Sequence, residues 1–134
     1  MPNTTVLIVE DDDTIRQLLT EYLQAHSHVT VEAARDGVEA LHQISTRPYD
    51  VVVLDVMMPK MSGVDLLDSL AELRRADAVQ PLKSLPAVLV ITSVSDGELP
   101  DRVLAKHCPE LVRGVFRKPL EINALAEEVE RYLR

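Results

Sequence analysis

The stretch VVVLDVMMP at residues 51–59 decides the fold and points to the site. Its first four residues are apolar, which indicates a strand buried on both faces of a sheet. Pro59 and the following Gly63 then force the chain out of the strand. Asp55 is therefore expected at the C-terminal end of a central strand, where open α/β sheets bind ligands. A carboxylate there needs a compensating charge, because a buried unpaired charge is unstable.

The composition is typical of a soluble single domain. The chain has 134 residues, 46% of them hydrophobic and 27% charged, and a formal net charge of −8. No apolar run approaches the roughly 20 residues of a membrane span, and no signal segment precedes the first strand. We therefore expect one domain over residues 1–134 and a cytoplasmic location. The acidic balance argues against direct nucleic-acid binding, and the single cysteine excludes an internal disulfide.

Strand and helix patterns alternate five times along the chain. Strands are predicted over residues 6–9, 29–33, 51–54, 87–91 and 115–116. Helices are predicted over about 13–25, from Asp36, around 66–73, from near Pro100, and from 122 to the end. Asp36 and Glu39 have the spacing of a capping box. The pattern predicts a doubly wound parallel sheet with helices on both faces, and the apolar first three strands are predicted to be central.

Polar residues follow four of these strands at the point where each strand ends. They are Glu10 and Asp11, Asp55, Thr92 and Lys118. Because the C-terminal ends of parallel strands share one edge, these side chains are expected to meet. A divalent cation would relieve the repulsion between the carboxylates, and few ligands, all oxygen, suit Mg²⁺. An ionised aspartate beside Mg²⁺ and a lysine can accept a phosphoryl group.

Together these pieces resemble the receiver domain of two-component response regulators, over essentially the whole chain. The matching pieces are residues 6–11 (VLIVED), 54–59 (LDVMMP) with 62–63 (SG), 90–93 (VITS) and 118–119 (KP). Each piece alone is weak, but all of them in order, each at a strand end, are highly specific. The resemblance implies the CheY-like, flavodoxin-like fold, with five helices and five parallel strands in the order 2-1-3-4-5.

The resemblance also implies the ligands of a Mg²⁺ ion. Asp11 would bind the metal directly, and Glu10 would act through water. Asp55 would be both a metal ligand and the phosphoacceptor, and Met57 would contribute its backbone carbonyl.

A signalling switch, and not a metabolic enzyme, is the implied function. Asp55 would take a phosphoryl group from a sensor histidine kinase or a histidine phosphotransfer protein. Thr92 would move toward that group and Lys118 would pair with its oxygens, so that the domain assists its own phosphorylation and hydrolysis. The fourth helix and fifth strand, the usual output face, would bind an unknown downstream protein or a second copy of the chain.

Val115 departs from the family pattern, which has an aromatic residue three positions before the lysine. We hypothesise that the signal travels through backbone shifts in residues 93–100 instead. Near-identical structures of that segment with and without a phosphoryl mimic would refute this hypothesis. Val115 also keeps open the alternative of a phosphorylation-independent scaffold.

Met57 and Val94 occupy the two positions that tend to set the dephosphorylation rate in this family. Both are apolar and cannot orient an attacking water, so we hypothesise that the phosphoryl group is retained comparatively long. Unchanged loss in both Met57→Asn and Val94→Glu would refute this second hypothesis.

Two other functions use related chemistry or a related fold. A phosphatase of the haloacid-dehalogenase type requires a second aspartate two residues after the nucleophile, where this chain has Met57. A flavin carrier requires a phosphate-binding loop after the first strand, and the acidic residues 10–13 would repel phosphate. Both rank below the receiver domain.

Overall fold

The computed structural model describes residues 5–26, 29–55, 63–76, 86–92, 111–117 and 121–132. Five parallel strands form one sheet in the order β2-β1-β3-β4-β5, which confirms the predicted topology. The strands are β1 (Thr5–Val9), β2 (Thr30–Ala34), β3 (Val51–Asp55), β4 (Ala87–Thr92) and β5 (Val112–Arg117). The helices are α1 (Asp13–His26), α2 (Gly37–Thr46), α3 (Gly63–Ala76) and α5 (Ile122–Arg131).

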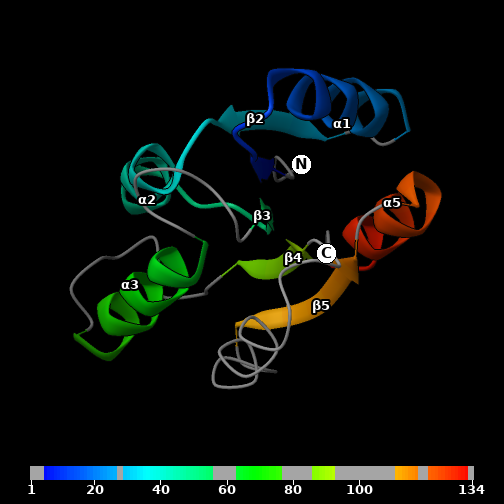
Figure 1. Ribbon diagram of the computed structural model, residues 1–134. Helices are drawn as coiled ribbons and strands as arrows, with labels where there is room; N and C mark the ends of the chain where they lie inside the picture. Colours follow the sequence, from blue (N-terminus) through cyan, green and yellow to red (C-terminus); the bar gives the residue numbers. More distant parts are fainter. Residues whose placement is uncertain are drawn as a thin grey trace.

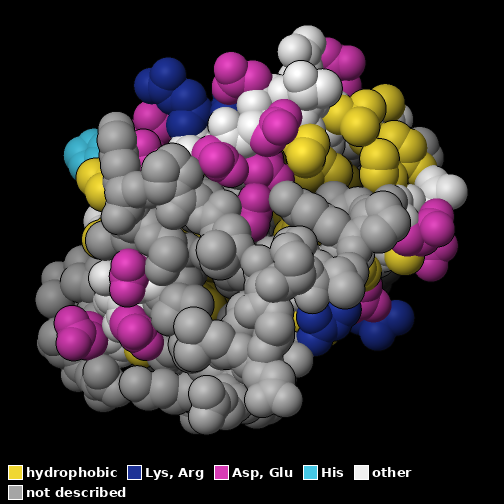
Figure 2. All heavy atoms as spheres, viewed as in Figure 1, with side chains coloured by type: hydrophobic (Ala, Val, Ile, Leu, Met, Phe, Trp, Pro, Cys, Tyr) yellow, Lys and Arg dark blue, Asp and Glu magenta, His cyan; other side chains and the backbone are white. Residues whose placement is uncertain are grey.

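The helices form a layer on each side of the sheet, α1 with α5 and α2 with α3 (Figure 1). Charged side chains lie around the outside of the helices, and an apolar group lies over the side of α1 and α5 (Figure 2). No helix in the described part of the chain is both long and apolar enough to cross a membrane. Four helices are described, and the fifth predicted helix, near Pro100, lies outside the described residues.

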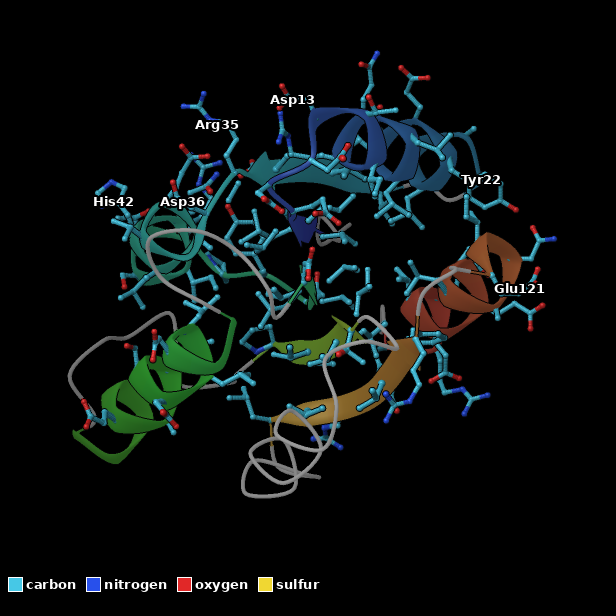
Figure 3. All side chains as sticks on the ribbon, viewed as in Figure 1. Asp13, Tyr22, Arg35, Asp36, His42 and Glu121 are labelled. Atoms are coloured by element: carbon cyan, nitrogen blue, oxygen red, sulfur yellow. The ribbon has the colours of Figure 1, made fainter. Side chains whose placement is uncertain are left out.

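The second helix begins with a modified form of the predicted capping box. The Asp36 side chain accepts a hydrogen bond from the Glu39 N–H at 2.8 Å, as an N-cap should. Glu39 accepts from the N–H of Arg35 at 3.1 Å, one residue before the expected donor. Arg35 and Asp36 both lie on the outer side of the start of α2 (Figure 3).

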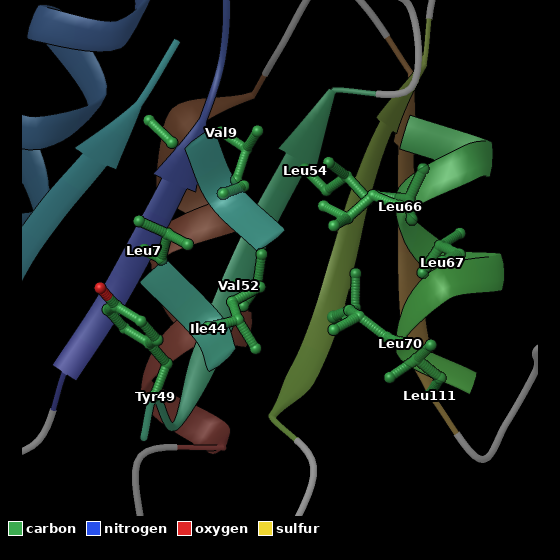
Figure 4. Close-up of a cluster of buried hydrophobic side chains, with 14 of the residues drawn as sticks. Leu7, Val9, Ile44, Tyr49, Val52, Leu54, Leu66, Leu67, Leu70 and Leu111 are labelled. Atoms are coloured by element: carbon green, nitrogen blue, oxygen red, sulfur yellow. The ribbon is translucent and has the colours of Figure 1, made fainter. Parts of the chain in front are cut away.

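Two apolar cores lie on opposite faces of the sheet. The first core lies under α2 and α3 and includes Leu7, Val9, Ile44, Val52, Leu54, Leu66, Leu67 and Leu70 (Figure 4). The second lies under α1 and α5 and includes Val6, Ile8, Leu19, Leu23, Val53, Leu125 and Val129. Successive residues of β1 and β3 alternate between the two cores, which explains their continuous apolar runs. Both strands are therefore covered on both faces of the sheet.

The prediction that the first three strands are central is wrong for β2, which is an edge strand. Its apolar residues include two alanines, and Glu32 in its middle is partly exposed. Small apolar side chains and an acidic residue in the middle of the strand are compatible with an edge strand, which has less surface to bury than a central strand. Strand β4 lies between β3 and β5 instead, and every residue after Ala87 is buried.

Strand β5 spans six residues, four more than the predicted 115–116. Its register against β4 shifts after the pair Val88–Val112, so that Leu89 pairs with Gly114 and Arg113 forms a bulge. A Cβ on Gly114 would lie 3.2 Å from Leu89 Cδ2, so glycine allows this close approach. The bulge and the glycine break the alternation that sequence reasoning relies on.

Candidate functional site

The register of β1 and β3 brings two acidic residues to one edge of the sheet. Val9 pairs with Leu54 in the register between the two strands, and Glu10 and Asp55 each follow that pair directly. Ligand oxygens of Glu10, Asp11 and Asp55 lie within 4.8 Å of one another. We call these three residues the acidic cluster. Acidic side chains gather at the corresponding place, next to the start of α1, in Figure 2.

The acidic cluster is suited to a hard divalent cation. Glu10 is 1% exposed and Asp55 3% exposed, whereas Asp11 faces solvent. Buried carboxylates held close together repel unless a positive charge compensates them. Each of the three can offer one oxygen, and a small set of carboxylate ligands completed by water is what Mg²⁺ prefers. The donor set therefore fits the predicted ion.

Hydrogen bonds hold the turn between β1 and α1 in place. The Glu10 N–H donates to the Ala34 carbonyl at 3.1 Å, and the Asp12 N–H donates to Glu10 Oε2 at 3.3 Å. The Ile15 N–H donates to Asp12 Oδ1 at 2.9 Å. Asp12 therefore acts as the N-cap of α1.

The role of Asp12 was missed by sequence reasoning, which considered it only as one of the acidic residues 10–13. The available signal was an aspartate three residues before the first apolar residue of the helix. Asp13 is the first residue of α1, in agreement with the helix predicted over about residues 13–25.

Thr92 lies at the same edge of the sheet as the acidic cluster. Asp55 pairs with Ile91 in the register between β3 and β4, so Thr92 is one residue further along the neighbouring strand. Its side chain is fully buried. The structure thus brings Glu10, Asp11, Asp55 and Thr92 to one edge, whereas Met57, Val94 and Lys118 lie outside the described residues.

The end of β5 carries Val115, the residue that departs from the family pattern in sequence. Val115 pairs with Val90, so it lies on the face of α2 and α3, and it is 43% exposed. Arg117 pairs with Thr92 and is also exposed. On the face that carries Thr92, β5 therefore presents Val115 at the position of the family's aromatic residue, followed by the exposed cation Arg117.

Comparison with known proteins agrees with this geometry. The chemotaxis protein CheY-3 of Vibrio cholerae is 30% identical over 129 residues, which are 96% of this chain and 91% of that protein. The protein-glutamate methylesterase/protein-glutamine glutaminase of Nitrosomonas europaea is 39% identical over 98 residues, 72% of this chain but only 25% of that protein. Among solved structures, the chemotaxis protein CheY4 of Vibrio cholerae superposes with a TM-score of 0.78 at 26% identity, covering 98% of this chain and 100% of that one.

The family model of the response regulator receiver domain matches residues 6–130. That match includes all five strands except the first residue of β1, together with the acidic cluster and Thr92. The protein therefore belongs to the response regulator receiver domain family.

Proposed function

We propose that this receiver domain accepts a phosphoryl group on Asp55 in a reaction that depends on Mg²⁺. The observation that carries the proposal is the acidic cluster, whose ligand oxygens lie within 4.8 Å of one another at the end of a buried strand. When bound, Mg²⁺ supplies neutralisation of the charge on the phosphoryl oxygens. Asp11 and Asp55 would hold the ion directly, Glu10 would act through water, and Met57 would add its backbone carbonyl.

The proposed transfer forms one bond and breaks one. A carboxylate oxygen of Asp55 attacks the phosphorus atom of a phosphohistidine, and the new O–P bond replaces the P–N bond. The imidazole of the donor leaves with the electron pair of that bond and takes up a proton. Thr92 donates a hydrogen bond to a phosphoryl oxygen, and the ammonium group of Lys118 pairs with another.

Proteins are the proposed partners on both sides of this reaction. A sensor histidine kinase or a histidine phosphotransfer protein supplies the phosphoryl group in the cytoplasm, and the phosphorylated form binds a downstream protein. The domain assists its own phosphorylation and hydrolysis, but its output is binding. A net charge of −8 favours protein partners over direct contact with nucleic acid.

Intact mass spectrometry with acetyl phosphate tests the proposal. We expect the wild type to gain one phosphoryl group with Mg²⁺ and none with EDTA, and Asp55→Asn to gain none. Asp50→Asn is a matched control, because Asp50 directly precedes the first residue of β3 and is exposed, whereas Asp55 is the last residue of that strand. Gain in Asp55→Asn would show that another residue is the acceptor. No gain in the wild type, with the donor kinase present as well, would favour the scaffold alternative.

A further inference from the structure

A cation from the chain itself lies in the turn between β1 and α1. Nη1 of Arg16 donates a hydrogen bond to the backbone carbonyl of Glu10 at 3.0 Å, and Nη2 forms an ion pair with Asp13. The Arg16 side chain is 17% exposed, whereas that of Asp13 is 84% exposed. We propose that Arg16 is a positioning residue for the cation site, because it fixes the turn that carries Glu10 and Asp11.

The contact with the Glu10 carbonyl matters because of where that carbonyl lies. A peptide group is planar, so the carbonyl of Glu10 and the N–H of Asp11 share one plane. Arg16 therefore sets the direction in which the chain continues to Asp11. The N–H of Glu10 is held by Ala34 and its Oε2 by the N–H of Asp12. The hydrogen bond from Arg16 is the third contact that holds Glu10 in place. Asp11 faces solvent, so its position depends most on this contact.

If Arg16 is removed, a positioning role and a purely electrostatic role predict changes of opposite sign in the affinity for Mg²⁺. If Arg16 acted only as a nearby positive charge, its removal would make the site more negative and Mg²⁺ would bind more tightly. If Arg16 positions the ligands, its removal weakens Mg²⁺ binding, typically by about 10- to 100-fold for residues that orient metal ligands. A lysine at position 16 should restore the affinity for Mg²⁺ only in part, because it lacks the planar guanidinium group whose two nitrogens reach two acceptors.

The experiment is a Mn²⁺ titration followed by electron paramagnetic resonance, with Mg²⁺ as competitor, since the chain has no Trp to report binding by fluorescence. We expect the Mg²⁺ Kd to rise about 10-fold in Arg16→Met and about 3-fold in Arg16→Lys. Arg35→Met is the matched control, because it removes the same charge from the equivalent turn before α2. Arg35 is 71% exposed and lies 3.7 Å from Glu39, so we expect a change of less than about twofold.

The thermal stability of the metal-free variants separates this role from a merely structural one. A lower melting temperature of Arg16→Met with an unchanged Kd would overturn the inference, and so would tighter binding. The inference rests on the proposed cation dependence, but the two fail differently. A wild type that binds no Mn²⁺ overturns both, whereas a wild type that binds Mn²⁺ as tightly as Arg16→Met overturns only the role of Arg16.

Discussion

Two regions of this protein compensate buried or half-buried carboxylates in different ways. Glu32, in the middle of β2, accepts a hydrogen bond from the Tyr49 hydroxyl at 2.6 Å and forms an ion pair with Arg47. The acidic cluster at the ends of β1 and β3 instead gathers three carboxylates within 4.8 Å. Glu32 is neutralised by side chains of the chain itself. The acidic cluster has the donor set of a site for a hard divalent cation.

The difference separates a structural acid from a functional one. Charges that the chain pairs internally stabilise one conformation and need no ligand. Charges of one sign held together lower the stability of the free protein, and a ligand that binds only the folded state restores it. The same residue type can therefore serve either purpose, and its neighbours in space decide which.

Metal affinity should show the largest contrast between the two regions. We expect Asp11→Asn to weaken Mg²⁺ binding by about 100-fold, or ~2.7 kcal/mol, because a direct carboxylate ligand loses its charge. Glu32→Gln should leave the affinity within about twofold, since it removes a charge that is already paired. Mn²⁺ titration with Mg²⁺ competition measures both. Equal losses in the two variants would mean that the affinity follows net charge and not the cluster.

Without metal, substitutions in the two regions should change the free energy of unfolding in opposite directions. Glu32→Gln should lower the free energy of unfolding by about 1.5 kcal/mol, because a charge-assisted contact with Arg47 and Tyr49 is weakened. Asp55→Asn should raise it by about 1 kcal/mol in EDTA, because Asp55 is 3% exposed and lies among like charges. Urea unfolding measures both values. Saturating Mg²⁺ should abolish the higher stability of Asp55→Asn relative to the wild type. If Asp55→Asn were less stable than the wild type in EDTA, the contrast between the two regions would be wrong.

Sequence reasoning worked best where burial and register act together. Asp55 and Glu10 each follow a run of buried residues on a central strand, so their convergence could be predicted without side-chain detail. Thr92 follows the same logic on β4. The alternation of the strands between two cores explains why such runs are reliable signals.

The parts that sequence reasoning missed depend on contacts between elements or on irregular backbone. Nothing in the pattern of β5 showed that Arg113 forms a bulge, since the shift in register arises where Gly114 meets Leu89. The edge position of β2 was implied only by the strand order of the family that the chain resembles, because an apolar run alone does not show which strands are neighbours. The contact of Arg16 with a backbone carbonyl has no signal in residue types, because any arginine on a helix would look the same.

The pH dependence of stability should give the smallest effect, and it belongs to the Glu32 region. Burial, followed by the hydrogen bond to Glu32 and its charge, raises the pKa of the Tyr49 hydroxyl well above its ordinary value of 10.0. In the unfolded chain Tyr49 loses its proton as the pH passes 10, while the folded protein keeps it. The stability that this proton contributes is thus complete below pH 10 and is lost progressively above it, at up to about 1.4 kcal/mol for each pH unit.

Urea unfolding between pH 9 and about pH 11 should therefore show a steeper loss of stability in the wild type than in Tyr49→Phe. The difference should reach roughly 1 kcal/mol, because only part of the titration is complete at the upper limit. Tyr22→Phe controls for the removal of a tyrosine hydroxyl that donates to another side chain, since Tyr22 of α1 donates to Asn123 of α5. Parallel slopes in the wild type and Tyr49→Phe would mean that Tyr49 ionises equally easily in both states. Glu32 would then be neutralised by Arg47 alone, and the contrast with the acidic cluster would rest on a single ion pair.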